Sequence, residues 1–433
     1  MAFSPITFYY NIKLGLAAEL IGLAWLIFAV WNGINDPIFG FLQDRTRSKL
    51  GRRIPYIRYG APFLGLFFVL LWCPLEGMNQ TFLFLYFLFL LLSFDTVFSA
   101  MSIAHGTLLP EIAFSSTSRA NLAIYVNLLT AIGTAVSFIF PLILLTGSET
   151  TSINPFLFPT IVLLAVVCCT IIYFSTYYLQ EKAYLQKEIP FGFMDSLKEC
   201  LKNKPWLIAQ AGWFSYTMCN TIFLTGIYYY IDYIVQLSGF LVILPLLIVY
   251  GMFIIFTIIL GPLMKRYSVK KLYIFGLLLT GGSMLLLFLM GWSIITALMA
   301  LIPLGVGFGA ISILGGVIGA DTMDYDEILT GKRREGIYGG IGAIINKPSI
   351  SIANWLFLST ISYFNFVDGA GINQQPDSAF IGIMVGFTII PALFAIIAAL
   401  IFLKFPLDGS EWEQKKLQLK KIHDQKEREY LNP

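Results

Sequence analysis

Residues Asn32–Ile57 read NGINDPIFGFLQDRTRSKLGRRIPYI, and they hold the densest charge cluster of the chain between two apolar segments. Five basic residues stand between Asp44 and Arg53, and one acid, Asp36, lies inside the preceding apolar segment. This pattern is typical of two membrane-spanning helices joined by a basic loop. The loop charge would orient the protein in the membrane, but it does not explain why Asp36 lies within the first helix.

The composition of the chain favours a membrane protein. Of its 433 residues, 57% are hydrophobic and only 12% are charged, and the mean hydropathy is +0.77. Soluble domains carry about 25% charged residues. A membrane-spanning helix needs roughly 20 apolar residues, and such segments recur along the whole sequence. Their length, and the lack of strict polar–apolar alternation, argue against spanning β-strands.

We predict eleven apolar spans and a defined orientation. The spans lie near 19–43, 54–73, 81–108, 121–146, 156–180, 206–233, 239–264, 273–293, 294–320, 337–362 and 379–405. Lysine and arginine are concentrated in alternate connections, at 44–53, 181–205, 265–272 and 321–336, and in the tail after residue 405. The intervening loops 74–80, 147–155, 234–238 and 363–378 contain neither. Since positively charged loops stay in the cytoplasm, the C-terminus is predicted to be cytoplasmic.

Asp36 is a candidate functional residue because an ionisable group inside a bilayer costs about 2.5–3.5 kcal/mol. Asn32 lies four residues earlier and therefore on the same helix face, and Asn35 is adjacent. Pro37 cannot donate a backbone hydrogen bond, which leaves the carbonyl of Gly33 without its helical partner. These oxygens suit Na⁺, and Asp36 could instead carry a proton. The alternative is that Asp36 only packs against a neighbouring helix.

Three stretches resemble the glycoside–pentoside–hexuronide:cation symporter family, the melibiose-permease branch of the major facilitator superfamily. They are NDPIFGFLQDRTRSKLGRRIPYI (35–57), LLPEI (108–112) and DTMDYDEILTGKRREGIYGGIGAIINK (321–347). The resemblance extends over essentially the whole chain. It implies an all-α membrane protein with the major facilitator fold, in which two six-helix bundles hold the substrate and cation sites between them.

The family pattern also divides the chain. We expect an N-terminal bundle at 1–180, a cytoplasmic interdomain loop at 181–205, a C-terminal bundle at 206–405 and a cytoplasmic tail at 406–433. The stretch FYYNIKLGL (8–16) is similar to the end of the family's first helix. We therefore expect residues 1–12 to form only a short helical piece, with the first helix largely missing and about eleven full spans.

The resemblance assigns a cation site to Asn32, Asn35, Asp36 and Ser99. One carboxylate of the family pattern is replaced by the amide of Asn32, which halves the fixed charge and favours H⁺ over Na⁺ as the coupling ion.

The substrate positions of the family carry over less well. Ser102, Gly106 and Asn127 match its sugar-binding positions but differ in chemistry, so a galactoside site is not expected. Lys347 matches a lysine near the substrate and cation sites, and Asp36 would be its partner; a lysine extending to the membrane surface is the alternative. Asp95 could contact substrate or make a structural pair.

A third group of charged residues suggests an inner gate. Asp321, Asp324 and Glu327 repeat every three residues and so share one side of a helix. They could pair across the two halves with the basic loop, while solvated surface charge is the alternative. The full set of predicted gating residues is Asp44, Arg45, Arg47, Arg52, Arg53, Asp321, Asp324, Glu327 and Arg333.

Together these features predict a secondary active transporter that couples H⁺ or Na⁺ to the symport of a small organic solute such as a glycoside or hexuronide. Cation-independent transport, a lipid-like substrate, and a sensor or scaffold without transport remain alternatives. We find no catalytic set, metal-ligand cluster or nucleotide-binding loop, so we expect no enzyme activity, no metal site and no cofactor besides the coupling ion. The expected partners are the solute and the lipid bilayer of the cell membrane, with no nucleic acid, and we expect a monomer.

Overall fold

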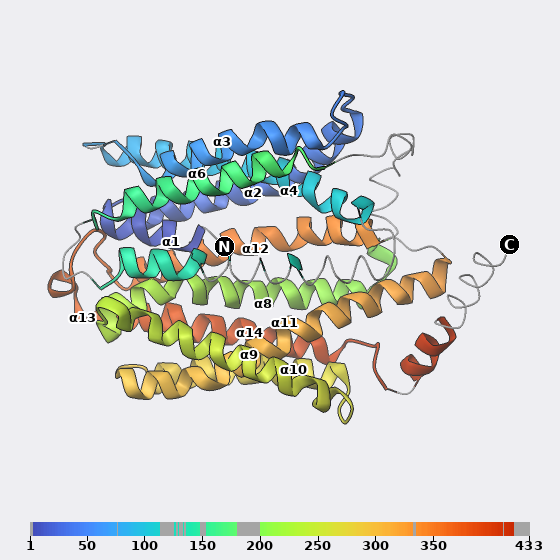
Figure 1. Cartoon of the computed structure of the whole chain (residues 1–433). Helices are drawn as coiled ribbons and strands as arrows, with labels where there is room; N and C mark the ends of the chain where they lie inside the picture. Colours follow the sequence, from blue (N-terminus) through green and yellow to red (C-terminus); the bar gives the residue numbers. More distant parts are fainter. Residues whose placement is uncertain are drawn as a thin grey trace. The chain divides into compact units, whose positions relative to one another are not determined.

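The computed structural model describes residues 3–75, 77–112, 125–126, 129, 133, 136–147, 153–179, 200–331, 335–409 and 411–419, and every regular element in these ranges is a helix (Figure 1). The long helices are α2 (Ala18–Arg45), α3 (Ile54–Trp72), α4 (Gln80–Ile112), α6 (Leu157–Ser175), α8 (Lys204–Tyr229), α9 (Leu244–Met264), α10 (Val269–Met290), α11 (Ile294–Thr330), α12 (Glu335–Tyr363) and α14 (Ile390–Leu403). The short ones are α1 (Phe3–Phe8), η1 (Tyr9–Lys13), η3 (Tyr230–Val235), η4 (Gly239–Ile243), η5 (Ile372–Gln374), α13 (Asp377–Met384) and η6 (Val385–Ile389). The all-α prediction is confirmed.

Eight helical segments of the described chain are long and apolar enough to cross a membrane. α8 and α12, with 26 and 29 residues, are also long enough. They are more polar, however, and carry buried groups such as Gln210, Thr225 and Asn354. The predicted span 121–146 falls largely outside the described residues, so the count of eleven spans stays a prediction.

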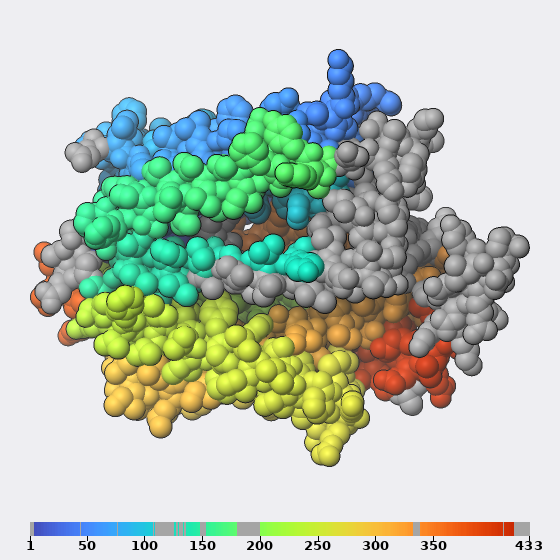
Figure 2. All heavy atoms as spheres, in the orientation of Figure 1, coloured from blue at the N-terminus to red at the C-terminus, as the bar shows by residue number. Residues whose placement is uncertain are grey.

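The long helices bury only part of their apolar surface within the protein. On α6, Leu163 and Ile171 are 62% and 64% exposed, and side chains of this helix lie on the visible face in Figure 2. In water such a surface would drive association. In a bilayer this exposed surface faces lipid chains that are as apolar as leucine, as expected for a helix whose outer side contacts lipid.

The start of the chain forms a short helical piece, as predicted. α1 has six residues and the π-helix η1 has five. At about 1.5 Å per residue, the two together are no longer than roughly 16 Å, about half the thickness of a bilayer core.

The chain forms two compact units, each of which is built from three separate stretches of the sequence. The first comprises Met1–Pro190, Leu224–Ile243 and Ile350–Ile383, and the second comprises Phe191–Phe223, Leu244–Ser349 and Met384–Pro433. The ends of α8 and α12 thus group with the N-terminal helices, whereas the predicted bundles divide the chain at 181–205. One reason is that Thr7 and Thr225 both contact the Asn354 side chain, the Thr225 hydroxyl donating to its Oδ1 at 2.9 Å.

In the first unit, α3 packs on both α4 and α6, and α2 packs on α4. Two hydrogen bonds set the register of α2 against α4. Trp31 Nε1 donates to Thr96 Oγ1 at 3.0 Å, and Gln43 Nε2 donates to the carbonyl of Ala100 at 2.7 Å. The two bonds attach α2 to α4 on either side of Asn32 and Asn35, which are buried.

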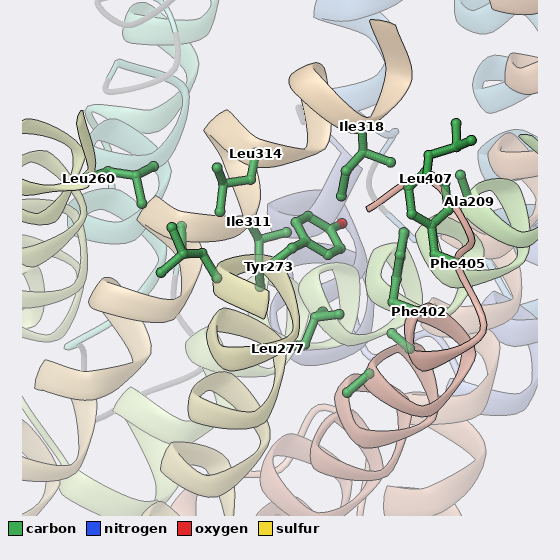
Figure 3. Close-up of a cluster of buried hydrophobic side chains, with 14 of the residues drawn as sticks. Ala209, Leu260, Tyr273, Leu277, Ile311, Leu314, Ile318, Phe402, Phe405 and Leu407 are labelled. Atoms are coloured by element: carbon green, nitrogen blue, oxygen red, sulfur yellow. The ribbon is translucent and has the colours of Figure 1, made fainter. Parts of the chain in front are cut away.

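In the second unit, α10 packs on α11 and α14, and α11 also packs on α9. Tyr273 of α10 lies in the core of this unit among Ile311, Leu314 and Phe402 (Figure 3). Its ring meets the ring of Phe402 edge to face, with centroids 4.5 Å apart. This apolar contact joins α10 to α14, and Lys270 Nζ also donates to the carbonyl of Leu403 at 2.9 Å.

Candidate functional site

The polar face of α2 is built as the spacing predicts. Asn32 and Asn35 are buried and Asp36 is half-buried. α2 continues as a helix through Pro37, so Asn32 and Asp36 remain one turn apart on one face. The three side chains offer amide and carboxylate oxygens in the middle of a membrane-spanning helix.

α4 supplies the other side of the site. Asp95 and Ser99, also one turn apart, are buried. Asn35 Nδ2 donates to Asp95 Oδ2 at 3.0 Å and lies 3.3 Å from the Asp95 carbonyl oxygen. The structure therefore brings a predicted cation ligand of α2 together with Asp95, a residue that the sequence suggested for substrate contact or structural pairing.

Several buried oxygens of these helices have no hydrogen-bond partner among the described residues. They are Asn32 Oδ1, Asn35 Oδ1 and Ser99 Oγ. Burying a polar atom without a partner costs about 1–3 kcal/mol. A hard cation takes such neutral oxygens together with carboxylates, so the donor set fits Na⁺ chemically. No cluster of three or more His, Cys, Asp or Glu side chains with metal-binding geometry occurs in the described ranges.

The predicted substrate positions are distributed differently. Ser102 and Gly106 are exposed on α4, and Asn127 lies outside the described residues. Lys347 is half-buried on α12, which continues as a helix through Pro348. Its pairing with Asp36, which belongs to the other compact unit, stays a prediction.

The basic loop after α2 is only partly exposed. Arg45 and Arg47 are exposed, and the Arg45 guanidinium lies 3.9 Å from the centre of the Phe41 ring. Arg52 is half-buried and Arg53 is buried. The side chain of Asp44 and all of Arg333 lie outside the described part of the chain.

The acidic repeat on α11 is not solvated surface charge at two of its three positions. Asp321 and Glu327 are buried, at 5% and 8% exposure, whereas Asp324 is half-buried. Asp321 accepts a hydrogen bond from Lys416 Nζ at 3.0 Å. Lys416 comes from the helical stretch 411–419 of the tail, so the tail supplies a cation that the sequence reading did not consider.

A neighbouring cluster on α11 was also missed. Asn203 immediately precedes α8, and its Oδ1 accepts a hydrogen bond from the Trp206 backbone amide at 3.1 Å. Its amide nitrogen bonds the Thr322 carbonyl and the Tyr338 hydroxyl, at 2.9 and 3.2 Å. Tyr338 also hydrogen bonds to the buried carboxylate of Asp326. Asp326 was not among the predicted residues, because it does not belong to the three-residue repeat of Asp321, Asp324 and Glu327.

A second polar cluster, which was not predicted from the sequence, holds η1 at the start of the chain. Asn11 is fully buried, and its Nδ2 bonds Asp368 Oδ1 at 2.6 Å and the Leu16 carbonyl at 3.0 Å. The Tyr229 hydroxyl donates to Asn11 Oδ1 at 3.0 Å, and the Ala18 amide donates to Asp368 Oδ2 at 3.1 Å. Burial raises the pKa of Asp368, and its hydrogen bonds from Asn11 and Ala18 oppose that rise.

Two glycines allow this cluster to close. Gly15 and Gly369 both have a φ of +68°, a conformation that costs other residues free energy. A Cβ atom on Gly369 would lie 3.0 Å from the Cα of Gly15, so the two backbones are in close contact. Asn11 in an aromatic stretch and Asp368 in a loop without basic residues were the only sequence signals for this contact.

Beside η1 lies an open pocket of about 400 Å³, lined in part by Tyr9, Lys13, Leu14 and residues 73–75. Burial lowers the pKa of Lys13, and the nearby Asp232 opposes this effect. Asp232 Oδ1 also accepts a hydrogen bond from the Gly147 amide at 2.6 Å. η1 is therefore tied to η3 by the charges of Lys13 and Asp232, and to the end of α8 through Asn11 and Tyr229.

Comparison of the sequence with known proteins shows the family of this chain. The model of a family described as MFS/sugar transport protein matches residues 4–409. A glucuronide carrier protein homolog of Escherichia coli (strain K12) is 23% identical over 419 residues, covering 94% of this chain and 88% of that protein. An isoprimeverose transporter of Lactiplantibacillus pentosus is 22% identical, covering 80% and 73%.

Among solved structures, the crystal structure of a D-xylose–proton symporter superposes with a TM-score of 0.64. The match covers 93% of this chain and 96% of that one, at 15% identity. At this identity the likeness concerns the fold alone, and it agrees with the major facilitator fold that the sequence motifs imply.

Proposed function

Because this chain belongs to the MFS/sugar transport protein family, we propose that it is a secondary active transporter that moves a glycoside or hexuronide together with a cation. The substrate class is supported by relatives named as a glucuronide carrier homolog and an isoprimeverose transporter. Alternating access is the transport mode proposed for this fold. The C-terminus would lie in the cytoplasm, because positively charged loops stay on that side of the cell membrane.

The observation that carries the cation-coupled part of this proposal is the buried oxygen cluster between α2 and α4. Asn35 contacts Asp95 directly, and buried oxygens of Asn32 and Ser99 have no hydrogen-bond partner among the described residues. Asp36 lies on the same face of α2 as Asn32. In the proposed mechanism the cation binds these oxygens and Asp36, and its charge sets whether the two halves can close around the solute.

The solute would be held by residues of both halves. We place Ser102, Gly106 and Asn127 on the N-terminal side of the site and Lys347 on the C-terminal side. A lysine ammonium suits the carboxylate of a hexuronide. Release of Lys347 from a pairing with Asp36 would then link solute binding to cation binding.

Counterflow in proteoliposomes tests the transport proposal. Vesicles loaded with unlabelled methyl glucuronide or isoprimeverose should take up the labelled compound transiently above its external concentration. An inward Na⁺ or H⁺ gradient should drive net accumulation, and empty liposomes are the control. Exchange without any cation dependence would support a uniporter, and movement of lysolipid alone would support a lipid-like substrate. If no solute moves, the protein is a sensor or scaffold and the transport proposal is wrong.

We propose that the acidic side of α11 belongs to an inner gate. A lysine in place of Asp324 would repel the basic loop where the half-buried carboxylate would attract it. Each 1.4 kcal/mol of lost attraction changes the ratio of closed to open states about tenfold. In Asp324→Lys, a Ser102→Cys reporter should be labelled faster than in the parent protein by a reagent added outside inverted vesicles, where the cytoplasmic face is exposed. The labelling is measured above the background of the native cysteines. Asp377→Lys, at an exposed position, is the matched control, and equal labelling of both variants would contradict a gating role.

A further inference from the structure

We propose that Asp95 is the second carboxylate of the cation site, and that the site therefore binds Na⁺ rather than H⁺. This inference rests on the proposed symport function and specifies its coupling ion. It assigns to Asp95 a role that differs from substrate contact and places a ligand on α4 one turn before Ser99.

The hydrogen bond between Asn35 and Asp95 carries the first step. Asn35 Nδ2 lies 3.0 Å from Asp95 Oδ2, and the two heteroatoms of an amide are about 2.3 Å apart. Asn35 Oδ1 therefore lies within roughly 5 Å of the Asp95 carboxylate. Two oxygens that bind the same ion at ligand distances of about 2.3–2.6 Å are at most about 5 Å apart. One ion can thus contact both residues.

The helix pairing carries the second step. Trp31 and Gln43 flank the polar face of α2 and are hydrogen bonded to Thr96 and Ala100 of α4, so the two helices are joined near both ends of this face. Asp95 and Ser99 share a face of α4, and Asn32 and Asp36 share a face of α2. The hydrogen bond from Asn35 to Asp95 joins these two faces, and Asn32, Asp36 and Ser99 each lie within about one helical turn of that bond along their helices.

Burial carries the third step. Asn32, Asn35, Asp95 and Ser99 are each exposed by 5% or less. Bulk solvent therefore does not reach the three oxygens of Asn32, Asn35 and Ser99 that have no hydrogen-bond partner in the described ranges. A proton would bind a single carboxylate and leave those three oxygens as they are. A Na⁺ ion can coordinate them together with the two carboxylates, and two negative charges compensate its loss of hydration.

The sequence alone favoured H⁺ because Asn32 replaces one acid of the family pattern. Asp95 restores the second negative charge from the neighbouring helix, which removes that reason. The two carboxylates together contribute a charge of −2, which one bound Na⁺ would reduce to −1. That difference is what a cation-dependent change of conformation requires.

Thermal unfolding of the intact purified protein tests the assignment without requiring a substrate. Melting temperatures are measured at pH 7.5 over a series of Na⁺ concentrations, with choline and K⁺ keeping the ionic strength constant. Na⁺ should raise the melting temperature of the wild-type protein with saturation. In Asp95→Asn the apparent Na⁺ affinity should fall at least tenfold. The exposed Asp377→Asn should respond as the wild type does.

Moving the second carboxylate from α4 to α2 tests whether Asp95 binds the cation or has only a structural role. In the double variant Asn32→Asp/Asp95→Asn the second carboxylate moves to α2, one turn from Asp36, and the Na⁺ response should return. If Asp95→Asn does not fold, Asp95→Glu carries the test: its displaced carboxylate should weaken Na⁺ binding several-fold.

Two results would overturn the assignment. One is unchanged Na⁺ affinity in Asp95→Asn or, where that variant does not fold, in Asp95→Glu. The other is a wild-type protein whose stability responds to pH but not to Na⁺. Counterflow on the same preparations tests the transport proposal separately from the Na⁺ site. Na⁺ binding without any solute movement would contradict the transport proposal but not the assignment of Asp95 to the cation site.

Discussion

Asp36→Asn should abolish uptake of solute against its gradient while leaving equilibrium exchange intact. Asparagine has nearly the same shape as aspartate, so the packing of half-buried Asp36 on α2 is preserved. The amide cannot balance the charge of a bound cation. Interactions with charged groups contribute about 1.5–3 kcal/mol, which corresponds to a loss of roughly ten- to hundredfold in cation affinity. The cation gradient would then no longer be coupled to the solute.

The measurement compares two assays on the same proteoliposomes. Uptake driven by a Na⁺ or H⁺ gradient should bring the internal solute only to its external concentration, with no accumulation above it, whereas counterflow should stay near that of the wild type. Asp377→Asn, which removes an exposed acid of the same unit, should behave normally in both assays. If Asp36→Asn still concentrates solute, Asp36 is a packing residue and coupling at this site is wrong.

Gly305→Ala should destabilise the second unit strongly. A Cβ atom at Gly305 would lie 2.3 Å from the Val249 carbonyl oxygen and 2.8 Å from the Met252 Cβ on α9. These are backbone and near-backbone atoms, so relief requires α9 and α11 to move apart. Overpacking of this kind costs about 1–3 kcal/mol and occasionally more, and small residues are what allow membrane helices to approach this closely.

Gly316→Ala is the matched control on the same helix. A Cβ atom at Gly316 meets nothing within 4 Å, and alanine is favoured over glycine within a helix by about 1 kcal/mol. This variant should be as stable as the wild type or slightly more so. Size-exclusion profiles and melting temperatures in detergent measure both variants. Equal stability of Gly305→Ala and Gly316→Ala would mean that α9 and α11 do not pack through Gly305.

The sequence by itself determined the class of the protein and one side of its candidate site. Long apolar segments specify membrane helices because the backbone must satisfy its own hydrogen bonds in lipid. Helical periodicity placed Asn32 and Asp36 on one face, and the structure keeps them there. The short helical piece at the start of the chain was likewise predictable from its length and residues.

Only the tertiary structure decided which polar groups meet. Asn35 and Asp95 are 60 positions apart, Asp321 and Lys416 are 95 apart, and Asn11 and Asp368 are 357 apart. Hydropathy and periodicity describe a helix and its faces but carry no information about which helix packs on which. That choice depends on side-chain shape at the contacts, such as Gly305 against Val249, and on buried hydrogen bonds that exist only once the helices are side by side.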